Sequence, residues 1–203
     1  PGPRLHHADD HAICQTYIDM YRVSGDKKMI QPFIETIDKF MVTPYETGEI
    51  RPITWWWCDA LFMGPAAFVK LGITLKDNKY LELNDKLFKE CYNLLYDKEY
   101  HLYARDMKYK WNEPGIKTIK EANGEKIFWS RGNGWVIAAM VRVLGQNPPD
   151  NKQRKEYISM LNAFRWTQTG FSILRIYCAR KSVEVIAASQ YSNVCRIRCI
   201  VSL

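Results

Sequence analysis

The chain has 203 residues, of which 47% are hydrophobic and 25% are charged. This composition is typical of a folded globular protein, and the length suffices for one sizeable core. No stretch approaches the roughly 18 apolar residues that a membrane helix requires, so we expect no membrane partner. The chain begins at Pro1 without an apolar signal core, and it looks like a piece of a longer protein. Its compartment stays open, because a bacterial cytoplasm and a periplasm are both compatible with it.

The net charge of +7 comes mostly from the end of the chain. From Ala163 on, the only acid is Glu184, and the basic residues are Arg165, Arg175, Arg180, Lys181, Arg196 and Arg198. The preceding part is therefore close to neutral. This distribution gives little support for nucleic-acid binding by the folded part, and we expect no nucleic-acid partner.

Apolar residues recur at helical spacing through residues 1–162, which predicts six helices. The expected helices run from about His11 to Gly25, from Asp26 to Met41, from the tryptophans at 55–57 to Leu71, from Asn78 to Tyr96, from just after Gly134 to Leu144 and from Asp150 to Leu161. Asp26 and Asp150 stand where N-cap residues are favoured. Residues 99–128 break the rhythm, and residues 101–109 are expected to be extended. Helices joined by short turns favour stacked helical hairpins.

Residues 163–203 form an atypical basic tail without helical periodicity. We expect the domain to comprise residues 1–162, and the tail either to result from a shift of reading frame or to be foreign to the domain. The alternative is a genuine series of edge strands at Val183–Ile186 and Ile197–Val201.

Three consecutive tryptophans, Trp55 to Trp57, run into a single acid, Asp59. Nearby indoles desolvate a carboxyl group, which raises its pKa above the roughly 3.9 of a free Asp. Such a group can hold a proton at neutral pH and donate it, and an indole offers a face for a sugar ring. The alternative is that the tryptophans belong to the core and that Asp59 only caps a helix.

Two acids, Asp9 and Asp10, lie between His7 and His11 at a helix start. Histidines four residues apart could bind a metal, and a metal hydrolase is a weaker alternative. No zincin Glu, no third ligand and no C-x-x-C pair accompany them, so we expect no metal. The acids also suit a helix N-terminus. A third interpretation pairs one of them with Asp59, because acid–base chemistry on a sugar needs two carboxyls in one cleft.

A second unusual segment contains Trp129, Arg131 and Trp135. Arginine can form a forked contact with a carboxylate, and two indoles beside it predict a pocket for an anionic sugar. The alternative is that the glycines of this segment only form a tight helix entry. Arg105, next to Asp106, is either an internal ion-pair partner or a cleft residue.

Four segments together resemble the unsaturated rhamnogalacturonyl hydrolases of glycoside hydrolase family 105, relatives of the unsaturated glucuronyl hydrolases of family 88. They are His-Ala-Asp-Asp-His-Ala at 7–12, Trp-Trp-Trp-Cys-Asp-Ala-Leu-Phe-Met at 55–63, Tyr-Ala-Arg-Asp at 103–106 and Phe-Trp-Ser-Arg-Gly-Asn-Gly-Trp at 128–135. Their order and spacing match the family from about residue 5 to residue 160.

The resemblance implies an all-α fold, an (α/α)6 toroid of six helical hairpins, which is incomplete in this chain. It implies hydrolysis of lyase-generated pectin (rhamnogalacturonan) oligosaccharides that end in a 4,5-unsaturated uronic acid. An Asp protonates C4 of the vinyl ether, water adds at C5, and the resulting hemiketal opens and releases the neighbouring sugar. No metal or organic cofactor takes part.

Carried over by position, Asp59 is expected to be the acid, with Asp10, or less favourably Asp9, as the second carboxylate. The expected substrate-binding residues are Trp57, Arg105, Trp129, Arg131 and Trp135. A partial toroid leaves apolar faces uncovered, so we also expect self-association. The alternative from another functional class is a non-catalytic carbohydrate-binding remnant of such an enzyme.

Overall fold

The structure is a computed structural model, and it describes residues 1–111, 113–146, 152–163, 171–179, 182–189 and 195–199. Its helices are α1 (Asp9–Ala12), α2 (Cys14–Ser24), α3 (Gln31–Val42), α4 (Ala60–Met63), α5 (Pro65–Leu75), α6 (Asn78–Leu95), α7 (Ser130–Gln146) and α8 (Lys152–Ala163). A 3-10 turn, η1 (Lys27–Met29), precedes α3. Two short strands, β1 (Tyr96–Asp97) and β2 (Leu102–Tyr103), pair in antiparallel fashion after α6.

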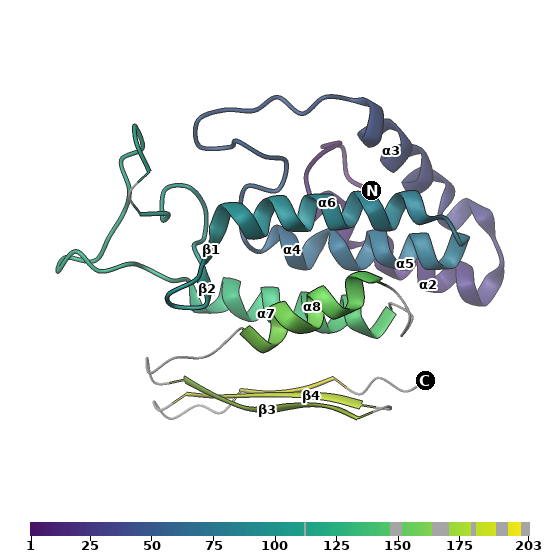
Figure 1. Cartoon of the computed structure of the whole chain (residues 1–203). Coiled ribbons are helices and arrows are strands. Elements are labelled where there is room, and N and C mark those ends of the chain that lie inside the picture. The colour runs from purple at the N-terminus through teal and green to yellow at the C-terminus, as the bar shows by residue number, and fades with distance from the viewer. Residues whose placement is uncertain (112, 147–151, 164–170, 180–181, 190–194, 200–203) are drawn as a thin grey trace.

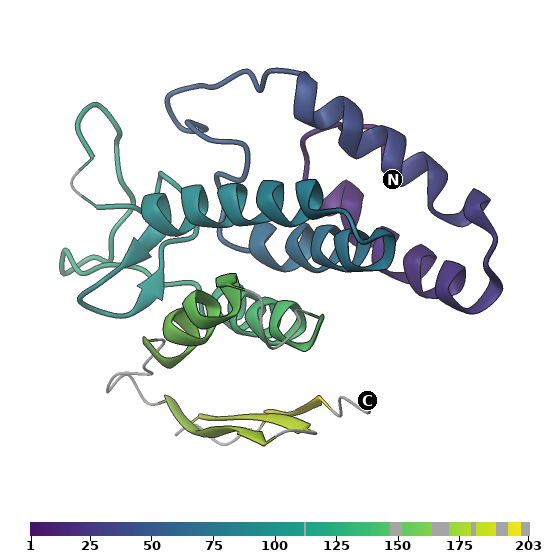
Figure 2. The same cartoon turned by 45° about the vertical axis from the view of Figure 1, so that its right-hand side comes forward.

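The helices form an inner row of α2, α5 and α7 and an outer row of α3, α6 and α8 (Figures 1 and 2). Neighbouring outer helices are joined by ion pairs. Lys79 Nζ on α6 lies 2.9 Å from Asp38 on α3, and Lys89 Nζ on α6 lies 2.9 Å from Glu156 on α8. Inner and outer helices alternate along the chain, as expected for helical hairpins.

The central element is α5, which packs against α2, α6 and α7. A helix that contacts neighbours on several sides must be apolar around most of its surface. Its buried residues are Pro65, Ala66, Ala67, Phe68, Val69, Leu71 and Gly72. The polar residue Lys70 lies on the remaining face, where its Nζ is 2.6 Å from Asp19 of α2. The helix α3 packs against α5 on the side of Phe68, whose ring centroid lies 5.9 Å from that of Phe33 on α3.

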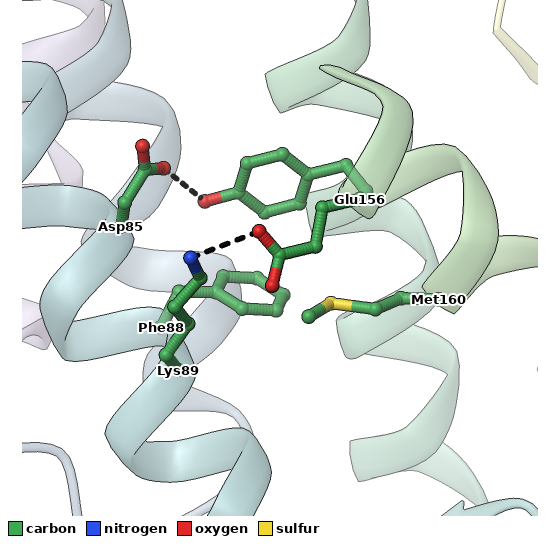
Figure 3. A pocket seen from close by; sticks show the side chains of 6 residues that line it. Asp85, Phe88, Lys89, Glu156 and Met160 are labelled. Carbon is green, nitrogen blue, oxygen red and sulfur yellow. Dashed lines mark hydrogen bonds and ion pairs between the residues drawn. The ribbon is translucent and has the colours of Figure 1, made fainter. Parts of the chain in front are cut away.

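A buried polar network fixes α8 on α6 (Figure 3). The Tyr157 hydroxyl donates to Asp85 Oδ1 at 2.8 Å and accepts from Asn84 Nδ2 at 2.9 Å, while its ring packs edge-on against Phe88. Burial raises the pKa of the Asp85 carboxyl. Because buried polar groups destabilise a fold unless they are hydrogen-bonded, this network defines how α8 packs against α6.

The helix boundaries confirm the predicted end of the first helix and correct two predicted starts. Gly25 follows α2 with φ of 70°, a left-handed C-cap that suits glycine. The helix predicted to begin at the tryptophans begins only after Asp59, and it is split into α4 and α5 at Gly64. Pro65, which lacks an N–H donor, begins α5 there. The helix predicted to begin after Gly134 begins earlier, at Ser130, so both glycines lie within it.

Two predicted caps have different outcomes. Asp26 accepts a hydrogen bond from the Lys28 backbone, so it does act as a cap, but of η1 and not of a long helix. Asp150 lies outside the described residues. Of the segment predicted to be extended at 101–109, only Leu102–Tyr103 form a strand, and residues 107–109 form a turn in which the Tyr109 N–H donates to the Asp106 carbonyl.

The tail contains an antiparallel sheet of β3 (Phe171–Ala179), β4 (Ser182–Ser189) and β5 (Cys195–Cys199), in that order. It agrees with the alternative interpretation of edge strands at 183–186 and 197–201, of which residues 200 and 201 lie outside the described residues. The tail is therefore an exception to the helical architecture. Its foreign origin stays a prediction.

The edge of the inner row at α2 carries an exposed apolar stripe. Its residues are Ile13, which is 54% exposed, Tyr17, Met20 and Val23, which is 90% exposed. These residues recur every three or four positions, so they share one helix face. None of the described helices combines the length and the apolar character required to cross a membrane.

Candidate active site

Three of the unusual sequence segments meet where inner helices begin. Asp9 begins α1, Asp59 immediately precedes α4, and Trp129 immediately precedes α7. The helix α4 contacts both α1 and α7, and in Figure 1 α4 and α7 begin at the side of the molecule where β1 and β2 lie. Each outer helix runs back along the inner helix that precedes it. The loops that lead into the inner helices therefore lie together at one end of the molecule.

Backbone hydrogen bonds connect two of these segments to the loop that follows β2. The Cys58 N–H donates to the Arg105 carbonyl at 2.9 Å, and Trp57 forms a bridge with Asp106. Asn133 on α7 is 1% exposed, and its amide both accepts from Tyr103 N at 2.7 Å and donates to Tyr103 O at 3.0 Å. This side chain pairs with a backbone donor and acceptor as a neighbouring strand would, and it holds β2 against α7.

Asn133 was missed as a key residue in the sequence. The sequence offered a weak signal, because a buried amide needs hydrogen-bond partners and Asn133 directly precedes the apolar residues of this helix. The sequence alone did not predict which backbone groups this amide would bond to.

Asp59 is half-buried, and its side chain makes no capping hydrogen bond although it occupies the N-cap position of α4. Burial raises the pKa of this carboxyl, and the charge of Asp9 raises it further, while Arg105 and Arg131 oppose the shift. The electrostatic surroundings of Asp59 thus include a second acid and two arginines. The side chain of Asp59 therefore does not act as the expected helix cap, and its pKa is shifted toward the protonated form.

The three tryptophans have different environments. Trp55 is fully buried, and its ring lies so close to Gly64 that a Cβ there would come within 2.4 Å of it. Trp56 and Trp57 are half-buried, with ring centroids 5.1 Å apart. The core interpretation therefore holds for Trp55, whereas Trp57 lies at the site.

Two arginines flank the Trp129 indole. The guanidinium carbon of Arg131 lies 4.8 Å from the ring centroid and that of Arg105 lies 5.9 Å from it. Arg105 also pairs with buried Asp106 at 3.1 Å, so the predicted ion pair is present. Arg105 remains half exposed, and its charge also acts on Asp59.

Trp135 lies one helical turn beyond Arg131 on α7 and is 37% exposed. Its ring packs against that of Phe62 on α4 with centroids 4.4 Å apart. Since residues at i and i+4 share a helix face, Trp135 extends the surface formed by Arg131 and Trp129.

The two neighbouring acids face different groups. Asp10 accepts hydrogen bonds from Arg4 N at 2.7 Å and from Arg4 Nη2 at 2.6 Å, and these contacts lower the pKa of its carboxyl. Asp9 is more exposed, and it is the acid whose charge raises the pKa of Asp59. The structure thus directs Asp10 toward the N-terminal segment and brings Asp9 into the electrostatic surroundings of Asp59.

The two histidines are also separated in role. His11 is buried, its Nε2 donates to the Leu5 carbonyl at 2.9 Å, and burial lowers the pKa of its imidazole to about 4. His7 packs on Trp57 with ring centroids 4.6 Å apart. Within the described residues, no three His, Cys, Asp or Glu side chains are grouped so that they could hold a metal ion, so the metal-hydrolase alternative gains no support there.

Gly132 and Gly134 provide a matched test of the Trp129 position. A Cβ on Gly132 would come within 2.2 Å of the Trp129 ring, whereas one on Gly134 would meet nothing within 4 Å. We expect Gly132→Ala to displace the indole and to weaken uronate-oligosaccharide binding about tenfold or more, since stacked aromatic contacts contribute on the order of 1–3 kcal/mol. Titration calorimetry would measure the affinity. Gly134→Ala is the control, and equal affinities of both variants would contradict this placement.

Asp59 should also make stability depend on pH. Its folded-state pKa is raised above the ordinary 3.8, so its contribution to stability is complete below that value and is lost as the pH rises through the folded-state pKa. We expect Asp59→Asn to unfold at a higher temperature than the wild type at neutral pH. The difference should shrink as the pH falls toward 3.8. Thermal unfolding across this range would measure it, and a difference independent of pH would contradict the assignment.

Several known proteins are similar to this chain in sequence and in fold. The sequence model of Glycosyl Hydrolase Family 88 matches residues 2–167. A curated relative from Formosa agariphila, named unsaturated 3S-rhamnoglycuronyl hydrolase, is 39% identical over 163 residues, which cover 76% of this chain and 43% of the relative. A solved family 88 glycosyl hydrolase from Bacteroides vulgatus is 34% identical with a TM-score of 0.69, covering 78% of this chain and 42% of that one.

A solved family 105 glycoside hydrolase from C. acetobutylicum shares the fold at 22% identity, with a TM-score of 0.59 over 80% of this chain and 47% of that one. The chain thus spans less than half the length of these relatives, and its helical part is an incomplete (α/α)6 toroid. The expected resemblance to families 105 and 88 is confirmed. Since the family model matches most of its length, the chain belongs to glycosyl hydrolase family 88.

Proposed function

We propose that this chain carries the catalytic acid of a glycoside hydrolase that removes a 4,5-unsaturated uronic acid from the non-reducing end of lyase-generated oligosaccharides. The observation that carries the proposal is Asp59. Its carboxyl is half-buried with a raised pKa, beside an acid and two arginines. The name of the Formosa relative, unsaturated 3S-rhamnoglycuronyl hydrolase, supports the same class of substrate.

In the proposed reaction, protonated Asp59 gives its proton to C4 of the vinyl ether. Water adds at C5, and the resulting hemiketal opens and releases the neighbouring sugar. Positive charge develops at C5 as C4 is protonated, so a nearby carboxylate stabilises the transition state and accepts a proton from the water. This chemistry needs one protonated and one charged acid, which the unequal surroundings of Asp59 and its neighbours can provide.

For the second acid, the electrostatics favour Asp9. The sequence alone favoured Asp10, but Asp10 is engaged by Arg4 through three hydrogen bonds. A carboxylate held in this way is poorly placed to exchange a proton with water. Asp9 is 46% exposed at its side chain and interacts with Asp59.

For the substrate, Arg131 is the proposed partner of the uronate carboxylate. Among the described residues, no acid lies within ion-pair distance of its guanidinium, whereas Arg105 already pairs with Asp106. Trp57, Trp129 and Trp135 supply the indole surface for the sugar rings, and Arg105 completes the cationic side. An unsaturated uronyl group linked to rhamnose is common to the pectin substrate expected from the sequence and to the name of the Formosa relative.

The ultraviolet absorbance of the conjugated enol-uronate provides the direct test. With unsaturated rhamnogalacturonan disaccharide, we expect wild-type absorbance to decay and Asp59→Asn to lower kcat by about 10²- to 10⁴-fold, the range for loss of a general acid. Asp9→Asn should lower kcat, whereas Asp10→Asn should mainly lower the unfolding temperature. A variant Asp59→Asn that retains the wild-type rate would refute the proposed acid.

The same assay separates the second candidate function. A chain that spans less than half of its relatives could bind oligosaccharides without turnover. Binding by calorimetry with no absorbance decay in either the wild type or Asp59→Asn would favour this carbohydrate-binding remnant.

Self-association is the proposed use of the α2 stripe, with a second copy of the chain as the partner. We expect light scattering to show a mass that increases with concentration, because an uncovered apolar helix face favours association. The double variant Tyr17→Glu/Met20→Glu should reduce this association, while Ser159→Glu, at an exposed position of α8, controls for added charge. A wild type that stays monomeric at all concentrations would contradict the prediction.

A further inference from the structure

The imidazole of His7 has one ring nitrogen, Nδ1, whose environment is not explained by the packing of the ring. Its ring stacks on Trp57 with centroids 4.6 Å apart and a tilt of 37°. Its Nδ1 atom is shielded from solvent without a hydrogen bond, and Asp9 Oδ2 lies 3.7 Å away. A shielded polar atom without a partner is destabilising, so such an atom calls for a functional explanation. Stacking on Trp57 accounts for the position of the ring but not for the direction of Nδ1.

The Asp9 carboxylate, in turn, has His7 as its nearby basic group. Within the described residues, His7 is the basic group at ion-pair distance from the Asp9 carboxylate. Arg4 also interacts electrostatically with Asp9, but its guanidinium and backbone N–H are engaged by Asp10. Without His7, the half-exposed Asp9 side chain could adopt several rotamers in solvent.

We propose that His7 is a positioning residue that holds the Asp9 carboxylate toward Asp59, an inference that rests on the proposed function. Trp57 fixes the plane of the imidazole, and the imidazole Nδ1–H donates to Asp9 once the pair closes from its present 3.7 Å. Hydrogen bonds of catalytic groups are often long before substrate binds and shorten afterwards. The charged groups that face this pair are Arg4, Asp10 and Asp59.

Two substitutions separate the hydrogen bond from the stacking. His7→Phe keeps a ring on Trp57 and removes the donor, whereas His7→Asn removes the ring and keeps an amide N–H near the place of Nδ1. With the unsaturated disaccharide, we expect His7→Phe to lower kcat about 10- to 100-fold with KM changed less than about twofold. His7→Asn should recover most of kcat. A role in packing alone predicts the opposite order of the two variants, and that order would overturn the proposal.

A double-mutant cycle of His7→Phe and Asp9→Asn tests the pair without activity. Denaturant unfolding should show a coupling of about 1.4- to 5-fold in the unfolding constant, the range for exposed ion pairs. Additive effects of the two substitutions would overturn the proposal whatever the activity.

The two measurements also distinguish this inference from the proposed function. An inactive wild type with clear coupling would refute the hydrolase activity of the chain and leave the His7–Asp9 pair established. An active wild type without coupling would support the activity and refute the role of His7.

Discussion

The amide of Asn133 connects the parts on which the site depends. Its two hydrogen bonds to the Tyr103 backbone hold β2 against α7. The loop that follows β2 accepts the Cys58 N–H at the Arg105 carbonyl. These contacts join the three segments that carry Asp59, Arg105 and Arg131, since they link Cys58, β2 with its loop, and α7. A buried amide without these partners would destabilise the fold, so the fold and the site require the same contact.

The proposed chemistry at this end of the molecule depends on an imbalance among its charges. Asp10 is neutralised by Arg4 and Arg105 is paired with Asp106, whereas Asp9 and Arg131 act on Asp59 with charges of opposite sign. Burial and the negative charge of Asp9 favour a proton on Asp59, while the arginines limit this effect. A carboxyl in such surroundings can both release and recover a proton, which is what hydration of a vinyl ether requires.

The toroid is incomplete, and this explains why its central and edge inner helices differ in how much apolar surface they expose. The central helix α5 has neighbours on α2, α6 and α7 and is apolar around most of its surface. The edge helix α2 has α5 on one side and exposes an apolar stripe that includes Ile13 and Val23. Both helices follow the same pattern of apolar burial, but the partner that would cover the stripe of α2 does not come from the described part of this chain.

The sequence by itself determined most of the helices, because periodic apolar residues and a Gly25 terminator act within a few residues along the chain. It also pointed to Asp59 and Arg131 as candidate site residues, because an acid beside indoles and an arginine between indoles are local patterns. Only the tertiary structure decided that Trp55 belongs to the core. It also decided that the charge of Asp9, rather than that of Asp10, raises the pKa of Asp59. These outcomes depend on Gly64 and Arg4, whose positions in space are set by packing and by chain folding and not by local spacing.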